Sequence, residues 1–197
     1  GTQIVAKGLD FANVGLVGII SADISLNIPD FRSAEKTFQL ITQAAGRAGR
    51  GEERGHVIVQ TYSPEHYAVT AAAAHDYEAF YRTEKKMRKL LGYPPYADMM
   101  QIVVSSAEES DAQAGADLTE ALLRCALGDR EALNLMGNRP APIGKASGRY
   151  RYHMILKCPK GKRPLYTSFI DAVQRQIIAD KKNKFNIYVD INPYSFM

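Results

Sequence analysis

The order of strands and helices after Pro95 constrains the fold more than any other feature of the sequence. Period-two and helical hydrophobic patterns there predict four strands and two helices. In chain order they are strand 98–106, helix 108–127, strand 132–137, strand 149–158, helix 164–181 and strand 184–193. The order β-α-β-β-α-β is that of a split βαβ, ferredoxin-like α+β domain.

The strand RYRYHMILKC, residues 149–158, alternates most clearly. One side of the strand carries Tyr150, Tyr152, Met154 and Leu156. The residues of the other side include Arg149, Arg151, His153 and Lys157. The two tyrosines could stack on nucleic-acid bases, as aromatic residues on a sheet do in RNA-binding modules. We favour a place in the core beneath the two helices, because regular alternation marks a buried face. His153 has no partner motif and is assigned no catalytic role.

The first region, residues 1–75, has an α/β order. Residues 1–11 are expected to form a short strand that breaks into a loop at Gly8. Further strands are expected over the apolar run 14–23 and over 55–62, with a helix between these two and another after residue 62. The run 14–23 is typical of a parallel strand that is buried on both faces. Ligands of such sheets bind at the carboxyl ends of the strands.

The string QAAGRAGR, residues 43–50, ends the helix of this region. In a continuing helix Gln43, Arg47 and Arg50 share one face, at i, i+4 and i+7. Guanidinium groups present a planar fork of donors that fits phosphate oxygens. The alternative is a surface helix with a glycine stop and basic residues favoured by its C-terminal dipole.

Composition sets further bounds. The chain has 197 residues and a net charge of +4, with a pI near 9.0, which permits an acidic partner such as nucleic acid. Cys125 and Cys158 lie far apart without a CxxC spacing, so neither a disulfide framework nor a zinc site is expected. No signal peptide or membrane span is evident, and a cytoplasmic setting fits. The chain begins without methionine inside an expected strand, as an excised piece of a longer protein would.

A long interval without acidic residues lies between Glu131 and Asp171. Its basic residues are Arg139, Lys145, Arg149, Arg151, Lys157, Lys160, Lys162 and Arg163. Lys145, Arg149 and Arg151 gather where PAPIGKASG is expected to form a glycine-bearing loop before a strand. Such a cluster can neutralise phosphates, so we predict a DNA contact there. Alternatively, acids of helix 108–127 lie nearby and compensate the charge.

Several motifs resemble a known family. GTQIVAKGLDF, residues 1–11, resembles motif V of superfamily-2 helicases, and QAAGRAGR resembles motif VI. The chain is more closely similar to the PriA family of primosomal replication-restart helicases. That resemblance continues through LLGYPPY at 90–96, PAPIGKASGRYR at 140–151 and VDINPYS near the end. It implies a partial RecA-like helicase lobe followed by a C-terminal domain that is similar to a small ribosomal protein and binds DNA.

The resemblance also implies roles for single residues. Arg47 and Arg50 would reach the ATP phosphates, Arg50 as an arginine finger, and Gln43 would help to couple nucleotide to DNA. Asp10 would face the ribose and Gly8 would allow the backbone turn there. DNA phosphates would be contacted by Thr2 and Lys7. Leu9 stands where relatives usually have histidine, which puts a polar contact from that position in doubt.

For the whole protein, the resemblance implies an ATP-dependent 3′–5′ DNA helicase that recognises stalled forks and restarts replication by primosome assembly. Its cofactors would be ATP, magnesium and zinc, with the zinc ligands outside this sequence. Its partners would be DNA, primosome proteins and single-strand-binding protein. No phosphate loop GxxxxGK[ST] occurs in the sequence, so the chain alone is predicted not to hydrolyse ATP. The expected domains are 1–75, a bridging helix and proline linker over 76–96, and 97–197.

Two other classes of function stay open at this point. The first is a non-catalytic nucleic-acid-binding protein with a ribosomal-protein-like module, which leaves residues 1–11 and 43–50 unexplained. The second is an unrelated α/β enzyme with an anion site, for which no catalytic constellation is recognisable.

Overall fold

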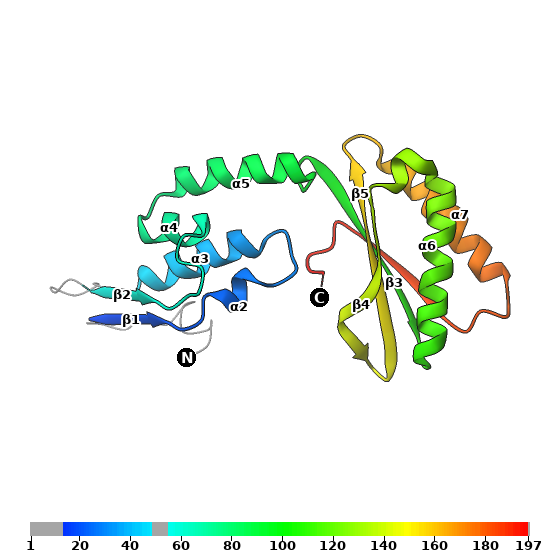
Figure 1. Cartoon of the computed structure of the whole chain (residues 1–197), viewed down its shortest axis with the longest axis horizontal. Helices are drawn as coiled ribbons and strands as arrows, with labels where there is room; N and C mark the ends of the chain where they lie inside the picture. The colour runs from blue at the N-terminus through cyan, green and yellow to red at the C-terminus, as the bar shows by residue number, and fades with distance from the viewer. Residues whose placement is uncertain (1–13, 49–54, 197) are drawn as a thin grey trace. The chain divides into compact units, whose positions relative to one another are not determined.

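The computed structural model describes residues 14–48 and 55–196. The chain divides into two compact units, Gly1–Met87 and Arg88–Met197 (Figure 1), and each is described by itself. The division falls inside helix α5, Tyr77–Leu91. Among the described helices, none combines the length and apolar character that crossing a membrane requires.

The first unit is built on two parallel strands. Strands β1 (Leu16–Ile19) and β2 (His56–Val59) pair from Leu16 opposite His56 to Ile19 opposite Val59, as the α/β order predicts. The helices of this unit are α2 (Asp23–Leu26), α3 (Ser33–Ala45), α4 (Tyr67–Ala73) and the larger part of α5. Phe38 of α3 stacks on Phe80 of α5 with ring centroids 4.3 Å apart, and this pair lies in the unit's core.

In the described part of the first unit, one face of this sheet is buried. Val17, Val57 and Val59 pack against the core, whereas Leu16 and Ile58 are each more than half exposed. The prediction of a strand buried on both faces is therefore wrong for β1 in the described residues, because helices cover one side alone. The strand expected over 1–11 lies outside the described residues.

The second unit is a ferredoxin-like domain. Its elements are β3 (Ala97–Ser106), α6 (Glu109–Ala132), β4 (Leu135–Ala146), β5 (Arg149–Pro159), α7 (Arg163–Ala179) and β6 (Asn186–Ile191). The sheet order is β4-β5-β3-β6 with all pairs antiparallel. Both helices cover the same face of the sheet (Figure 1). The predicted element order and domain type are confirmed.

The core lies between this sheet and its helices. From the sheet, Met100, Ile102 and Met154 contribute fully buried side chains, and Tyr166 of α7 closes the layer from the helix side. Tyr152 is buried in the same cluster and Tyr150 packs against it. The interpretation of these tyrosines as core residues is confirmed. The opposite surface, which carries the other residues of each strand, is called here the open face.

The structure corrects one boundary in this unit. Strand β4 was expected over 132–137 and extends from Leu135 to Ala146, so the predicted PAPIGKASG loop is wrong. Proline is tolerated because β4 is an edge strand, where a missing N–H breaks no ladder bond. The pairing with β5 is irregular at two places, between Met136 and Arg139 and between Pro140 and Lys145. Such bulges are typical of sheet edges.

Candidate nucleic-acid interface

The predicted phosphate-binding residues of the first unit are only partly described. Helix α3 ends at Ala45, and Gly46 and Arg47 continue in a turn. Gln43 is exposed on the helix and Arg47 is half-buried beyond its end. The expectation that Gln43 and Arg47 share one helical face is therefore wrong, since the helix stops before Arg47. The other candidates, Thr2, Lys7, Gly8, Asp10 and Arg50, lie outside the described residues.

A buried carboxylate fixes the carboxyl ends of β1 and β2. Asp23 accepts hydrogen bonds from the Thr61 hydroxyl and the Tyr62 backbone N–H, both at 3.0 Å. Burial alone would raise the pKa of Asp23, but these hydrogen bonds outweigh it and hold the pKa below its ordinary value. Both carboxylate oxygens thus hold the segment that follows β2 beside the start of α2, which is a structural role.

The second unit places most of its predicted basic site at the tip of a hairpin. Strands β4 and β5 are joined by Ser147 and Gly148, whose φ values are 51° and 75°. Two residues with positive φ make a tight hairpin turn whose twist matches that of the strands. The turn pairs Ala146 with Arg149, and it pairs Lys145 with Tyr150.

This register separates the three predicted DNA contacts. Lys145 lies opposite Tyr150 on the helix-covered face, and its ammonium group is 4.2 Å from the centroid of that ring. Arg149 and Arg151 alternate with the core tyrosines, so both lie on the open face. The structure therefore brings Arg149 and Arg151 together and places Lys145 on the other side of the sheet.

Arg149 is fixed by the neighbouring strand. Its Nη2 donates to the backbone carbonyl of Ser105 at 2.9 Å and its Nε to the Ser105 hydroxyl at 3.3 Å. Arg151 lies directly opposite Ser105 in the β3–β5 register. The two guanidinium groups therefore share one small region at the end of β3.

A third arginine lies on the same face. Arg139 of β4 is opposite His153, and its Nε lies 3.3 Å from the imidazole Nε2. The amide of Gln101 lies 3.2 Å from Nδ1 of the same imidazole. Burial lowers the pKa of His153 to about 4, and the charges of Arg139 and Arg151 add to this effect. His153 is therefore neutral at pH 7 and serves as a hydrogen-bonded support for Arg139.

An exposed tyrosine completes this surface. Tyr188 of β6 is opposite Val103, which is in turn opposite His153, so all three lie on the open face. The Tyr188 side chain is 56% exposed, although it sits in the middle of a strand. We define the open-face patch as five residues: Val103, Arg139, Arg149, Arg151 and Tyr188. It contains three guanidinium groups and an aromatic ring. One carboxylate, that of Asp190, lies on the same face two residues after Tyr188.

The sequence analysis did not single out Tyr188. The signal was present in NIYVDI, residues 186–191, where Ile187 and Val189 alternate with Tyr188. The two aliphatic residues pack against the core, which leaves the tyrosine for the opposite face. Because aromatic residues are common in cores, the pattern alone did not distinguish it from the buried tyrosines of β5.

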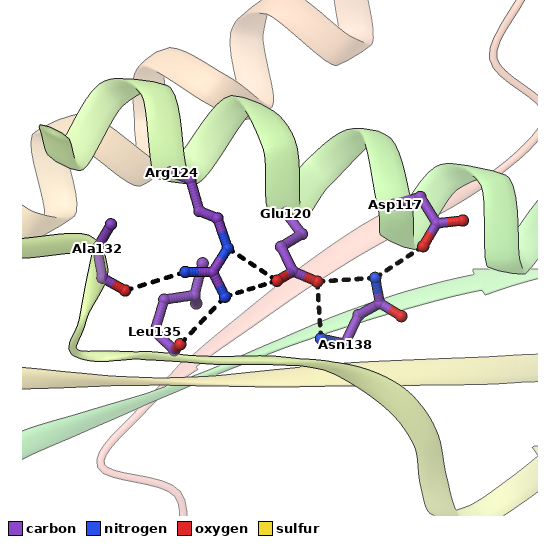
Figure 2. A network of polar contacts seen from close by, with 6 residues as sticks. All are labelled: Asp117, Glu120, Arg124, Ala132, Leu135 and Asn138. Carbon is purple, nitrogen blue, oxygen red and sulfur yellow. Dashed lines mark hydrogen bonds and ion pairs between the residues drawn. The ribbon is translucent and has the colours of Figure 1, made fainter. Parts of the chain in front are cut away.

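A polar network holds the irregular strand that carries Arg139 (Figure 2). Glu120 of α6 accepts from the backbone N–H and the side-chain amide of Asn138, both at 2.9 Å. Arg124 donates to Glu120 at 2.7 Å and also reaches the carbonyls of Ala132 and Leu135. The network ties β4 to α6 at its first bulge, one residue before Arg139.

The described residues contain no group of three or more His, Cys, Asp or Glu side chains that could hold a metal ion. Cys125 is exposed, Cys158 is buried, and both are free thiols. The open-face patch offers guanidinium groups and an aromatic ring. Such a surface binds phosphates and bases.

Comparisons with known proteins match both units. The family model of the primosomal protein N C-terminal domain matches residues 89–194. The chain is 43% identical over 199 residues to the replication restart protein PriA of Bacillus subtilis, covering all of this chain and 24% of that protein. The replication restart protein PriA of Synechocystis is 42% identical over 163 residues, covering 81% of this chain and 19% of its own length.

The replication restart protein PriA of Treponema pallidum is 34% identical over 199 residues, covering all of this chain and 29% of that protein. The chain thus spans about a quarter of the length of the curated relatives it matches. Since these matches include the first unit, a ribosomal-protein-like module alone does not account for the similarity.

Proposed function

Since the chain belongs to the primosomal protein N family, that of the replication restart protein PriA, we propose that its second unit binds DNA through the open-face patch. The observation that carries this proposal is the gathering of Arg139, Arg149 and Arg151 on one face, where the carboxylate of Asp190 lies in the row of Gln101 and Ile155, beyond that of Arg139 and His153. A surface that serves only solubility usually mixes both signs of charge. Binding of an anionic partner explains this clustering of arginines better than solubility alone does.

The proposal extends to a longer protein like these relatives, of whose length this chain matches about a quarter. It is an ATP-dependent 3′–5′ DNA helicase that recognises stalled replication forks and restarts replication in the cytoplasm. Primosome proteins and single-strand-binding protein are its partners, and zinc is held by residues outside this sequence. The support for these statements is the family membership and the motif resemblance.

The first unit contributes one side of the ATP site in this proposal. Arg47 and Arg50 bind the phosphates, with Gly8 and Asp10 at the ribose and Gln43 between nucleotide and DNA. Thr2 and Lys7 contact DNA phosphates. The donor set suits these roles, because arginine is always charged and its planar fork matches phosphate oxygens. When bound, ATP would supply the phosphoryl group that is transferred, and magnesium would neutralise charge on its phosphates.

The hairpin offers a matched pair of variants for testing the DNA contact. Arg151→Ala and Lys145→Ala each remove one positive charge, six residues apart, from opposite faces of the same hairpin. We expect Arg151→Ala to weaken binding to single-stranded and duplex DNA with little dependence on sequence. It should also reduce the salt slope by about 0.7 to 0.9 for the lost phosphate contact.

The measurement is fluorescence anisotropy of labelled oligonucleotides over a range of salt concentrations, using the 197-residue chain. Lys145→Ala should change affinity and slope much less. If the two variants lose affinity equally, DNA contacts both sides of the hairpin. If Arg151→Ala leaves both quantities unchanged, the proposed DNA surface is wrong.

A further inference from the structure

From the same surface we infer that the open-face patch takes single-stranded DNA, with one unstacked base lying on the ring of Tyr188. This inference rests on the proposed DNA binding and names the form of DNA that the patch accepts. It depends on an exposed aromatic ring on the same face as the arginines.

The ring of Tyr188 is placed for contact with a planar ligand. The residue lies in the middle of β6, which is an edge strand, and its side chain is 56% exposed. Asn186, the next open-face residue along the strand, lies 3.4 Å from its hydroxyl group through Nδ2. An exposed tyrosine on a sheet loses little conformational freedom when a base stacks on it, since few torsions must be fixed.

The tyrosines of β5 cannot take this role. Tyr152 is buried and Tyr150 packs against the core on the helix-covered face. Tyr188 is therefore the aromatic member of the open-face patch. The alternating tyrosines of β5 suggested base stacking from the sequence, but the exposed tyrosine of this face belongs to β6.

The arginines are placed to hold the backbone of the same strand. Arg151 and Tyr188 are on β5 and β6, which flank β3 on either side. The backbones of β5 and β6 are therefore two strand spacings apart, which is about 10 Å. Arg149 is already fixed by Ser105, so its side chain loses less conformational entropy on binding than a free arginine would.

A single strand fits this arrangement better than a duplex. Inside a duplex both faces of each base are covered by its neighbours in the stack, so a ring on a flat sheet can reach only an unstacked base. Stacking is tolerant of sequence, because every base has a π-face. The patch should therefore discriminate strand form more than base identity.

The absence of tryptophan from the sequence allows a direct test. Tyr188→Trp places a single tryptophan on the open face, and Leu165→Trp places one at an exposed position of α7 in the helix layer. Both variants are titrated with a 15-nucleotide dT oligomer and with a duplex of equal length. We expect the oligomer to quench the fluorescence of Tyr188→Trp strongly, and the duplex to quench it less. Leu165→Trp should change little.

Affinity measurements give a second, independent readout. Tyr188→Ala should weaken binding of the dT oligomer by roughly five-fold to a hundred-fold, the range for loss of one stacked base, and should weaken duplex binding much less. Tyr188→Phe retains the ring and should bind like the wild type.

The outcomes separate this inference from the DNA-binding proposal. If Arg151→Ala weakens binding but tryptophan at position 188 is not quenched and Tyr188→Ala binds normally, the stacking inference is overturned and the proposed function stands. Equal quenching by oligomer and duplex would also overturn the preference for single strands. If the wild-type chain binds neither DNA, the proposed function fails first.

Discussion

His153 illustrates how its neighbours set the chemistry of one residue. Its side chain is 3% exposed, one nitrogen faces Gln101 and the other faces Arg139. Burial and two nearby guanidinium groups keep the imidazole neutral, with a pKa of about 4. The imidazole therefore acts as a neutral hydrogen-bonding group between the side chains of Gln101 and Arg139.

The depressed pKa of His153 predicts a pH-dependent stability. In the unfolded chain its pKa returns to about 6.5, so the unfolded state binds more protons between pH 6.5 and 4. The stabilising contribution is present above this window and is lost as the pH falls through it. Between pH 7 and 5 we expect the free energy of unfolding to fall by about 2 kcal/mol.

The measurement is urea unfolding at both pH values, followed through the NMR amide signals of β5. His153→Gln keeps a hydrogen-bonding side chain but does not titrate, so this part of the pH dependence should disappear. His75→Gln, at an exposed position of the first unit, is the control and should retain it. An unchanged pH dependence in His153→Gln would show that other groups cause it.

At the scale of elements, hydrophobic periodicity predicted the second unit well and its turns less well. Helix α6 agrees with the predicted helix up to Leu127, after which Gly128 adopts φ 72° and interrupts the helical geometry. Strand β4 was missed over much of its length because prolines and glycines signal loops. An edge strand with bulges accommodates both prolines and glycines. Whether a strand lies at the edge of the sheet depends on which strands pair with it, and no local sequence pattern specifies that pairing.

The arrangement of the predicted basic site also depended on strand pairing that the local sequence pattern does not specify. The sequence correctly gathered Lys145, Arg149 and Arg151 near one hairpin. Which face each side chain takes depends on the length of the turn, because a shift of one residue in register exchanges the two faces. With the PAPIGKASG segment interpreted as a loop, that register was undefined.

The network in Figure 2 gives a prediction about β4 as an element. Burial alone would raise the pKa of Glu120, but hydrogen bonds from Asn138 and Arg124 outweigh it and hold the pKa below its usual value. Glu120→Ala leaves the Asn138 N–H and the Arg124 guanidinium without this acceptor. The expected loss of stability is about 1–3 kcal/mol, with faster amide exchange in β4.

Thermal unfolding and hydrogen exchange are the measurements for this variant. Asp117→Ala is the matched control on the same helix, since Asp117 accepts a single exposed hydrogen bond from the Asn138 side chain. It should lose much less stability. Equal effects of the two substitutions, or unchanged exchange in β4, would contradict a central role for Glu120.

At the scale of the molecule, both units place helices on one face of their sheet, and the described sheets differ in size. The second unit has a four-stranded sheet with two helices on one face and a continuous core. In the first unit, the described residues include a two-stranded sheet whose Leu16 and Ile58 are largely exposed. The sequence predicted strands for a larger parallel sheet here, and the part of that prediction that falls on residues 1–11 stays a prediction.

The final prediction concerns the motor of the whole protein. In the longer protein, Arg50→Ala should lower DNA-stimulated ATP hydrolysis by about a thousand-fold or more, because a finger arginine stabilises charge on the phosphoryl group during transfer. Arg47→Ala should act similarly. DNA binding should change little in both, since the open-face patch is intact.

Phosphate release by the longer protein is the measurement, with DNA affinity determined in parallel. Arg151→Ala is the opposite control: it should weaken DNA binding while ATP turnover at saturating DNA stays near that of the wild type. The 197-residue chain alone should release no phosphate with or without DNA, since its sequence contains no phosphate loop. Normal ATP turnover in Arg50→Ala would show that Arg50 is not part of the ATP site. DNA-stimulated ATP turnover by the isolated chain would contradict the proposal that the motor is divided between this chain and the rest of the protein.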